Sequence, residues 1–322
     1  MNHLLSIEDL DRAEIERIVA QAQRFAEVSD REIKKVPALR GRMVLNLFYE
    51  ASTRTRSSFE LAAKRLSADV VNFAASGSSV EKGESLKDTV LTLSAHKPDA
   101  IVLRTPWAGA SELVSRWCSA AIVNAGDGKH EHPTQALLDV FALRRRLGKL
   151  DGARIWIVGD VLHSRVARSN IYLLSKLGAS VSVAGPGTLV PPEFAELIEQ
   201  GVRVERKIED ALVDADVVMI LRVQRERQTD AFVPSMREYA VHYGLQLRHL
   251  NLAAPDAIAM HPGPMNRGVE ISSEIADGGR SLILEQVTNG VAVRMAVLYL
   301  LAGGAPKNGN GSRKGRRAKT DN

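Results

Sequence analysis

Hydroxyl and guanidinium side chains crowd into the segment STRTR, residues 52–56, directly after the apolar run MVLNLFY. Ser52 can cap a helix that begins at Thr53, and the amide N–H groups at such an N-terminus favour an anion. Thr53 and Thr55 add hydroxyl donors, and the planar guanidinium of Arg54 can grip a phosphate. The segment therefore indicates an anion site. An ordinary capped helix with exposed arginines is the alternative, and the Gly-x-x-x-x-Gly-Lys pattern of a P-loop is absent here.

A second group of donors lies in HPTQ, residues 132–135. His132 stands at an expected strand-to-helix corner. Gln135 falls in the first helical turn, from which its side chain can reach back into a cleft at the end of the strand. A neutral histidine there could donate a hydrogen bond to a carbonyl oxygen, whereas local capping is the alternative. His130 and His132 form a short pair without a third ligand at suitable spacing, so we expect no metal.

The elements that must position these residues alternate along the chain as short apolar strands and helices. The strands are rich in Val, Ile and Leu, which is typical of parallel strands covered on both faces, so we expect an α/β protein with two doubly wound parallel sheets. We expect strands at Met43–Phe48, Asp69–Phe73, Ala100–Leu103, Ala121–Asn124, Arg154–Val158, Ser180–Ala184, Val217–Ile220 and Ala257–Met260. We expect helices near 53–66, 85–96, 111–118, 133–147, 165–177 and 207–214.

A domain boundary is expected where the helix over 133–147 ends at Gly148 and a turn leads into a new strand. This predicts a first domain over residues 1–147 and a second over 148–281, with the active-site cleft between them. The helix of about 282–303 is too apolar for a free surface, so we expect it to pack back on the first domain.

Ligands of open parallel sheets bind at the carboxyl ends of the strands. The segments that follow the expected strands are rich in Arg, His, Gln, Ser and Thr and poor in acids. They therefore predict a cationic cleft, rich in hydrogen-bond donors, for a ligand with several negative charges. These segments are EASTRTR, RTP, AGDGKHEHPTQ, GDVLHSR, LRVQRER and HPGPMNRG.

Length and composition are those of an ordinary globular protein: 322 residues, 45% hydrophobic and 25% charged. Cys118 is the single cysteine and reads as a core residue, so a reducing cytoplasm is expected, without a signal peptide or membrane helix. The net charge of +5 equals the surplus of six basic residues over one acid in the tail 304–322, which we expect to be disordered. An electrostatic role of the tail stays open, but the body gives no reason to expect nucleic-acid binding.

Seven segments in order resemble the catalytic chains of aspartate carbamoyltransferases, within the aspartate/ornithine carbamoyltransferase superfamily. They are FYEASTRTRSSFE, VEKGESLKDT, LRTP, NAGDGKHEHPTQALLD, GDVLHSRVARS, LRVQRER and HPGPMNRGVEI. The resemblance implies transfer of a carbamoyl group from carbamoyl phosphate to L-aspartate in pyrimidine biosynthesis, without metal or organic cofactor.

The resemblance also implies roles for individual residues. Those of the carbamoyl phosphate site are Ser52, Thr53, Arg54, Thr55, Arg104, His132, Gln135, Gly263 and Pro264, of which Arg54, Thr55, Arg104 and His132 are catalytic. Those of the aspartate site are Lys82, Arg165, Arg222 and Gln224.

Further implications concern assembly and domain closure. Ser78 and Lys82 match a loop that family members lend to a neighbouring subunit, which implies a homotrimer; regulatory or dihydroorotase chains could join it. Glu50 is implied to pair with Arg165 and Arg227 when the domains close, a surface Glu without a fixed partner being the alternative.

One departure and several rivals remain. Many family members carry HPLPR where this chain has HPGPMNRG, which leaves the role of Arg267 open. Ornithine carbamoyltransferases usually have HCLP and a Ser-Met-Gly element, and both are absent. A non-catalytic anion-binding subunit is a further alternative. The segment VGDVLHSRVA is similar to a dinucleotide-binding turn but lacks Gly-x-Gly-x-x-Gly.

Overall fold

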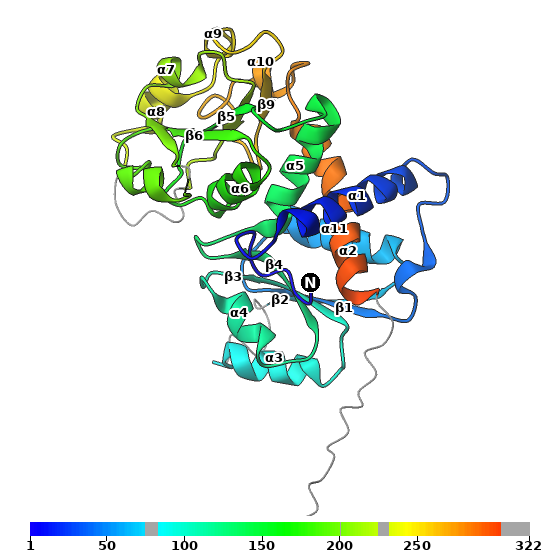
Figure 1. Ribbon diagram of the computed structural model, residues 1–322. Helices are drawn as coiled ribbons and strands as arrows, with labels where there is room; N and C mark the ends of the chain where they lie inside the picture. Colours follow the sequence, from blue (N-terminus) through cyan, green and yellow to red (C-terminus); the bar gives the residue numbers. More distant parts are fainter. Residues whose placement is uncertain (75–82, 200, 225–231, 304–322) are drawn as a thin grey trace, which may run out of the picture.

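The computed structural model describes residues 1–74, 83–199, 201–224 and 232–303, which form two lobes joined by long helices (Figure 1). The strands are β1 (Met43–Phe48), β2 (Asp69–Ala74), β3 (Ala100–Thr105), β4 (Ala121–Asp127), β5 (Arg154–Val158), β6 (Ser180–Ala184), β7 (Arg203–Glu205), β8 (Val217–Ile220) and β9 (Ile258–Met260). The α-helices are α1 (Arg12–Ser29), α2 (Thr53–Arg65), α3 (Leu86–Ser94), α4 (Ala110–Ser115), α5 (Pro133–Leu147), α6 (Arg165–Lys176), α7 (Ile208–Leu212), α8 (Met236–Tyr243), α9 (Leu247–Leu250), α10 (Ser273–Ala276) and α11 (Ile283–Ala302), and the 3₁₀ helices are η1 (Pro37–Leu39) and η3 (Pro192–Glu196).

Two parallel sheets form the centres of the lobes, which confirms the expected α/β class. The first sheet has the order β2-β1-β3-β4 and the second β7-β6-β5-β8-β9. Three strands reach further than expected: β2 includes Ala74, β3 includes Arg104 and Thr105, and β4 continues to Asp127. The short edge strand β7 was not expected. None of the helices in the described ranges is long and apolar enough to cross a membrane.

Each sheet is covered on both faces, as alternate residues of its strands show. Val44 of β1 belongs to a core shared with α1, α2, α5 and α11, whereas Leu45 packs into a separate core with Val90 of α3 and Val114 of α4. In the second sheet Ile155 and Trp156 divide between two cores in the same way. Since successive side chains of a strand point to opposite faces, this division defines doubly wound sheets.

The strand order reverses once in each sheet, and both reversal points face the space between the two sheets. In the first sheet β2 lies on one side of β1, and the later strands β3 and β4 lie on the other side, so the reversal lies between β1 and β3. In the second sheet it lies between β5 and β8. Loops diverge at such a reversal and leave a crevice beyond the carboxyl ends of the strands, which is where ligands of this fold class bind.

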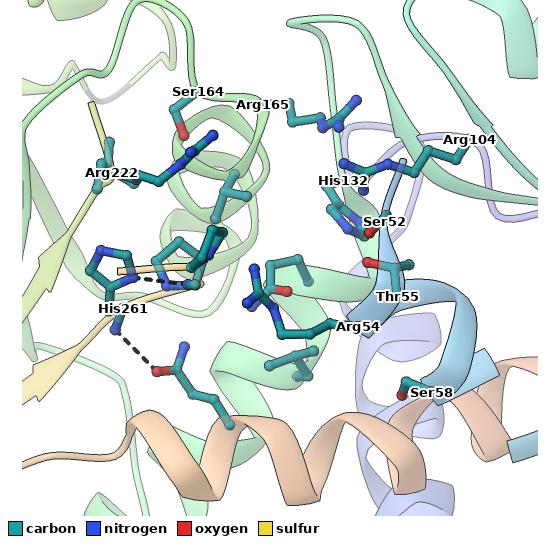
Figure 2. A pocket seen from close by; sticks show the side chains of 18 of the residues that line it. Ser52, Arg54, Thr55, Ser58, Arg104, His132, Ser164, Arg165, Arg222 and His261 are labelled. Carbon is teal, nitrogen blue, oxygen red and sulfur yellow. Dashed lines mark hydrogen bonds between the residues drawn. The ribbon is translucent and has the colours of Figure 1, made fainter. Parts of the chain in front are cut away.

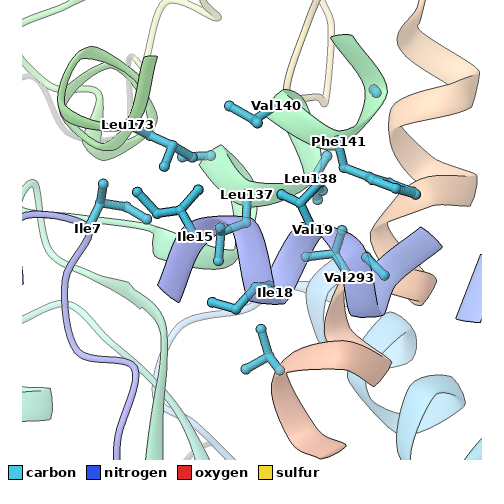
Figure 3. Close-up of a cluster of buried hydrophobic side chains, with 14 of the residues drawn as sticks. Ile7, Ile15, Ile18, Val19, Leu137, Leu138, Val140, Phe141, Leu173 and Val293 are labelled. Atoms are coloured by element: carbon cyan, nitrogen blue, oxygen red, sulfur yellow. The ribbon is translucent and has the colours of Figure 1, made fainter. Parts of the chain in front are cut away.

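The C-terminal helix α11 returns to the first lobe, where it packs against α1, α2 and α5. Figure 3 shows Val293 of α11 within the same apolar cluster as Ile18 of α1 and Phe141 of α5. Leu173 of α6 joins this cluster from the second lobe. One continuous core therefore connects the two sheets. The exact division into two domains at residue 147 stays a prediction.

Candidate active site

A cavity of about 1010 Å³ lies between the two sheets and is lined from both reversal points. In Figure 2, Arg222, Ser164 and His261 lie on one side of it and Ser52, Thr55, Arg104 and His132 on the other. Arg54 extends from α2 between the two groups. Among the described residues that line the cavity, the basic ones are Arg54, Arg104, Lys129, Arg165, Arg222 and Arg294, and Glu50 is the one acid.

The first element that could bind an anion is the start of α2, and the helix begins at Thr53 as expected. The prediction that Ser52 caps it is wrong: Ser52 occupies the N-cap position, but its side chain makes no capping hydrogen bond. Its ψ of 89° departs from the extended conformation that brings a capping oxygen over the helix end, and the residue lines the cavity instead. The first amides of α2 are therefore left for a ligand.

Arg54 is the cation most directly offered to a ligand. Within the described part of the chain its guanidinium makes no hydrogen bond or ion pair. Burial, followed by the positive charge of Arg222, lowers the pKa of Arg54. Two nearby positive charges repel each other in a partly buried place, so an anion between Arg54 and Arg222 would relieve that repulsion.

Arg104 and His132 reach the cavity from the ends of β3 and β4. Arg104 Nη1 donates to the Ala125 carbonyl at 3.2 Å. His132 is the N-cap residue of α5, but its side chain makes no capping bond, and its backbone N–H donates to Ser169 Oγ at 2.8 Å. The capping alternative is therefore wrong for His132, whose ring lines the cavity (Figure 2).

Arg165 joins the two lobes at the edge of the cavity. Its Nη2 lies 2.6 Å from Glu50 Oε2, and its Nη1 donates to the Gly128 carbonyl at 3.2 Å. Glu50 Oε2 also lies 3.3 Å from Arg104 Nε. Gly126, at φ +116°, is needed here because a Cβ would stand 2.8 Å from Arg165 Cζ. Glu50 thus has fixed partners, and Arg165 both lines the cavity and holds the lobes together.

The segment after β8 is held by a buried carboxylate. Asp160 is fully buried, and its Oδ2 accepts the backbone N–H of Gln224 at 3.1 Å. Its Oδ1 lies 2.7 Å from His163 Nδ1. This brace places Arg222 and Gln224 on the second-lobe side of the cavity, as the sequence predicted.

The segment after β9 approaches Arg54 through Gly263, which has φ +68° and precedes Pro264 in a cis peptide. A Cβ at residue 263 would lie 3.3 Å from Arg54 Cζ, so the glycine leaves room for the guanidinium. Arg267 points elsewhere: it forms an ion pair with Asp277 at the surface and is not among the lining residues. Three residues named from the sequence, Ser78, Lys82 and Arg227, lie outside the described residues.

Several residues that the sequence reading missed belong to the site or support it. Ser164, His261, Gln286 and Arg294 line the cavity. Gln286 and Arg294 are polar residues on the buried face of the apolar helix α11, which is the signal that could have identified them. Asp139 lies one helical turn after Gln135, and its Oδ1 accepts from Gln135 Nε2 at 2.9 Å and from Gln286 Nε2 at 2.7 Å.

Asp139 and Arg294 are buried charges within this support. Burial raises the pKa of Asp139 to about 6, against the opposing effect of its amide donors and of Arg294. Burial also lowers the pKa of Arg294 to about 10. Arg294 donates to Ser58 Oγ at 2.9 Å and lies over the ring of Phe59. In the described ranges, no group of three or more His, Cys, Asp or Glu side chains is arranged to hold a metal ion.

Comparison with known proteins agrees with this geometry. Residues 2–145 match the carbamoyl-P binding domain of the aspartate/ornithine carbamoyltransferases, and residues 151–301 match their Asp/Orn binding domain. The fold and the site thus define a carbamoyltransferase. The chain belongs to the aspartate/ornithine carbamoyltransferase family, as its motifs predicted.

Particular relatives point to one branch of the family. An aspartate carbamoyltransferase catalytic subunit from Salinispora arenicola is 58% identical over 304 residues, which is 94% of this chain and 99% of the relative. Aspartate transcarbamoylase from Trypanosoma cruzi, solved with carbamoyl phosphate and aspartate, superposes with a TM-score of 0.83 at 32% identity, covering 92% of this chain and 96% of that one. Ornithine carbamoyltransferase from Pyrococcus furiosus has a TM-score of 0.84 at 28% identity, covering 94% and 98%.

The raised pKa of Asp139 predicts a pH-dependent contribution to stability. The folded protein keeps this proton up to about pH 6, whereas the unfolded chain releases it near the ordinary value of 3.8, so ionisation costs stability as pH rises between them. Relative to Asp139→Asn, the wild-type free energy of unfolding should fall by up to about 3 kcal/mol from about pH 4 to about pH 6. Denaturant titrations of both proteins across this range would measure it, and parallel pH curves would contradict it.

Proposed function

We propose that this chain transfers the carbamoyl group of carbamoyl phosphate to the amino group of L-aspartate, giving N-carbamoyl-L-aspartate and phosphate. The observation that carries the proposal is the convergence of Arg54, Arg104, Arg165 and Arg222 on one cavity from both sheets. The two substrates bring a phosphate and two carboxylates, and this arrangement supplies the positive charge that they require. The reaction would serve pyrimidine biosynthesis in the cytoplasm.

The first lobe, together with the segment after β9, would bind carbamoyl phosphate. The amides at the start of α2, with the hydroxyls of Ser52, Thr53 and Thr55, would hold the phosphate, together with the Arg54 guanidinium. Gln135 Oε1 and the backbone carbonyls of Gly263 and Pro264 would accept hydrogen bonds from the carbamoyl NH₂. These groups all line the cavity, which supports the assignment.

The transfer itself would need hydrogen-bond donors to the carbonyl oxygen rather than a nucleophilic side chain of the protein. The uncharged amine of aspartate would attack the carbamoyl carbon, the C–O bond to phosphate would break, and the departing phosphate would accept the proton that the amine loses. Arg104, His132 and Thr55 would stabilise the oxyanion that forms on the carbonyl oxygen, each such donor being worth about 3–4 kcal/mol. Arg54 would stabilise the departing phosphate.

The second lobe would select the acceptor through Arg165, Arg222 and Gln224. Guanidinium groups suit the carboxylates of aspartate, whereas the second ammonium group of ornithine would be repelled by Arg222. Arg222 lines the cavity beside Arg54, which supports a dicarboxylic acceptor. We assign carbamoyl phosphate binding to residues 1–147 with α11, and aspartate binding to residues 148–281.

We also propose a homotrimer in which Ser78 and Lys82 of one chain complete the site of its neighbour. The support is the resemblance of GSSVEKGE to the shared loop of the family. Glu50, already paired with Arg165, would hold the domains closed around both substrates, with Arg227 as a second partner.

An acceptor assay tests the function. The purified protein with carbamoyl phosphate should release phosphate when L-aspartate is added and not when L-ornithine is added. Arg54→Ala should lower kcat by at least about 10²-fold, because it removes the cation nearest the leaving phosphate. Arg56→Ala, on the same helix but outside the cavity lining, is the control and should retain activity. Phosphate release with ornithine alone would overturn the assignment.

Removing Glu50 should weaken domain closure. Glu50→Ala leaves the buried Arg165 without its carboxylate partner, so the aspartate KM should rise about tenfold. Steady-state kinetics with varied aspartate would measure the change. Glu112→Ala, which removes an exposed ion pair with Arg116, should leave the KM unchanged. Equal aspartate KM values for Glu50→Ala and wild type would contradict the closure role.

Subunit complementation tests the shared site. Arg54→Ala and Lys82→Ala should each be nearly inactive as pure proteins. After the two are dissociated, mixed and reassembled, roughly a quarter of wild-type activity should return, because random pairing joins an intact Arg54 with an intact Lys82 in that fraction of sites. A mixture no more active than its two components would show that each chain uses its own Lys82 or none.

A further inference from the structure

Asp139 is a fully buried carboxylate that three side-chain amides surround. Its Oδ1 accepts from Gln135 Nε2 at 2.9 Å and Gln286 Nε2 at 2.7 Å, and its Oδ2 accepts from Asn170 Nδ2 at 2.9 Å. These donors come from α5, α11 and α6, so the carboxylate stands where three helices of both lobes meet. The charge of Arg294 on α11 faces it as well.

The carboxylate fixes the direction of the Gln135 amide. An ionised carboxylate can only accept hydrogen bonds, so Gln135 must turn its NH₂ toward Asp139 and its Oε1 away from it. Gln135 lines the cavity, and among the described residues no hydrogen bond occupies its Oε1. The cavity is therefore presented with an acceptor at this point and not with a donor.

The same carboxylate acts on a second segment through Gln286. Because Gln286 gives its NH₂ to Asp139, its Oε1 is left to accept the backbone N–H of His261 at 3.1 Å. His261 Nδ1 in turn accepts the backbone N–H of Gly263 at 2.9 Å. This chain of bonds sets the conformation of the segment that carries the Gly263 carbonyl (Figure 2).

We propose that Asp139 is a positioning residue that orients two carbonyl acceptors, Gln135 Oε1 and the Gly263 backbone oxygen, and so makes the cavity select an acyl phosphate that carries NH₂. This rests on the proposed function, in which both acceptors bind the carbamoyl NH₂. Acetyl phosphate has the same phosphate and carbonyl but a methyl group in place of NH₂, and it cannot use these acceptors. Discrimination between the two ligands is therefore the property that Asp139 controls.

The test compares Asp139→Asn with wild type in binding carbamoyl phosphate, acetyl phosphate and inorganic phosphate by calorimetry. Asparagine keeps the volume but offers one accepting oxygen to three donors, so the Gln135 amide loses its imposed direction. Carbamoyl phosphate should bind about tenfold more weakly, while acetyl phosphate and phosphate stay within about twofold of wild type. Unchanged discrimination would overturn the proposal.

Two further variants separate the possible outcomes. Asp99→Asn is the matched control, since Asp99 accepts from Arg42 and Met43 at the opposite end of the first sheet; an equal loss of discrimination there would overturn the specific role of Asp139. Gln135→Met should by itself lower discrimination at least as much as Asp139→Asn, while the Gly263 acceptor remains. If Gln135→Met lowers discrimination and Asp139→Asn does not, the positioning role of Asp139 is wrong and the role of Gln135 stands. If neither variant lowers discrimination, the assignment of Gln135 in the proposed function is wrong as well.

A variant outside α5 covers the case in which Asp139→Asn does not fold. Gln286→Met keeps the carboxylate and its bond to Gln135 but removes the link to His261. It should weaken carbamoyl phosphate binding by about threefold and leave acetyl phosphate binding within about twofold of wild type. Unchanged discrimination in this variant would contradict the action of Asp139 through Gln286. If Asp139→Asn does not fold, the same result would overturn the proposal.

Discussion

Repulsion between like charges is the constraint around which this molecule is arranged. Six basic side chains line one cavity with a single carboxylate among the described lining residues, and two of them, Arg54 and Arg222, are close enough for one to lower the pKa of the other. Such a group cannot assemble by attraction among its members. It exists because two sheets, joined through one continuous core, hold their strand ends against one another. Glu50, placed between Arg104 and Arg165, offsets part of the repulsion where the lobes meet.

The sequence predicted those parts of the site that depend on local order. A strand end followed by polar residues can be recognised within ten residues, so the start of α2, the corner at His132 and the segment at Arg222 were all placed on the cavity. The error at Ser52 has the same origin: capping preference is a local statistic, and here the backbone turns the side chain toward the cavity instead. Arg267, whose role the sequence left open, forms a surface ion pair with Asp277.

The supporting residues could not be predicted because their partners are distant in the chain. Asp139 and Gln286 are 147 positions apart, and nothing in the sequence says which buried polar groups will meet. The two glutamines and the carboxylate illustrate why such groups persist in a core: each amide has two different ends, and a group that only accepts decides which end faces the cavity. Burial makes that carboxylate costly to ionise, so the protein fixes the direction of the two glutamine amides at a cost to the stability of its fold.

The return of α11 to the first lobe has a consequence for how the chain can fold as it is synthesised. The second sheet is built from residues between Arg154 and Met260, all of which leave the ribosome before α11 does. The apolar faces of α1, α2 and α5 are completed only by α11, at the end of the described chain. Although it comes first in the sequence, the lobe that contains the N-terminus must therefore wait with part of its core uncovered, and the later lobe can finish before it.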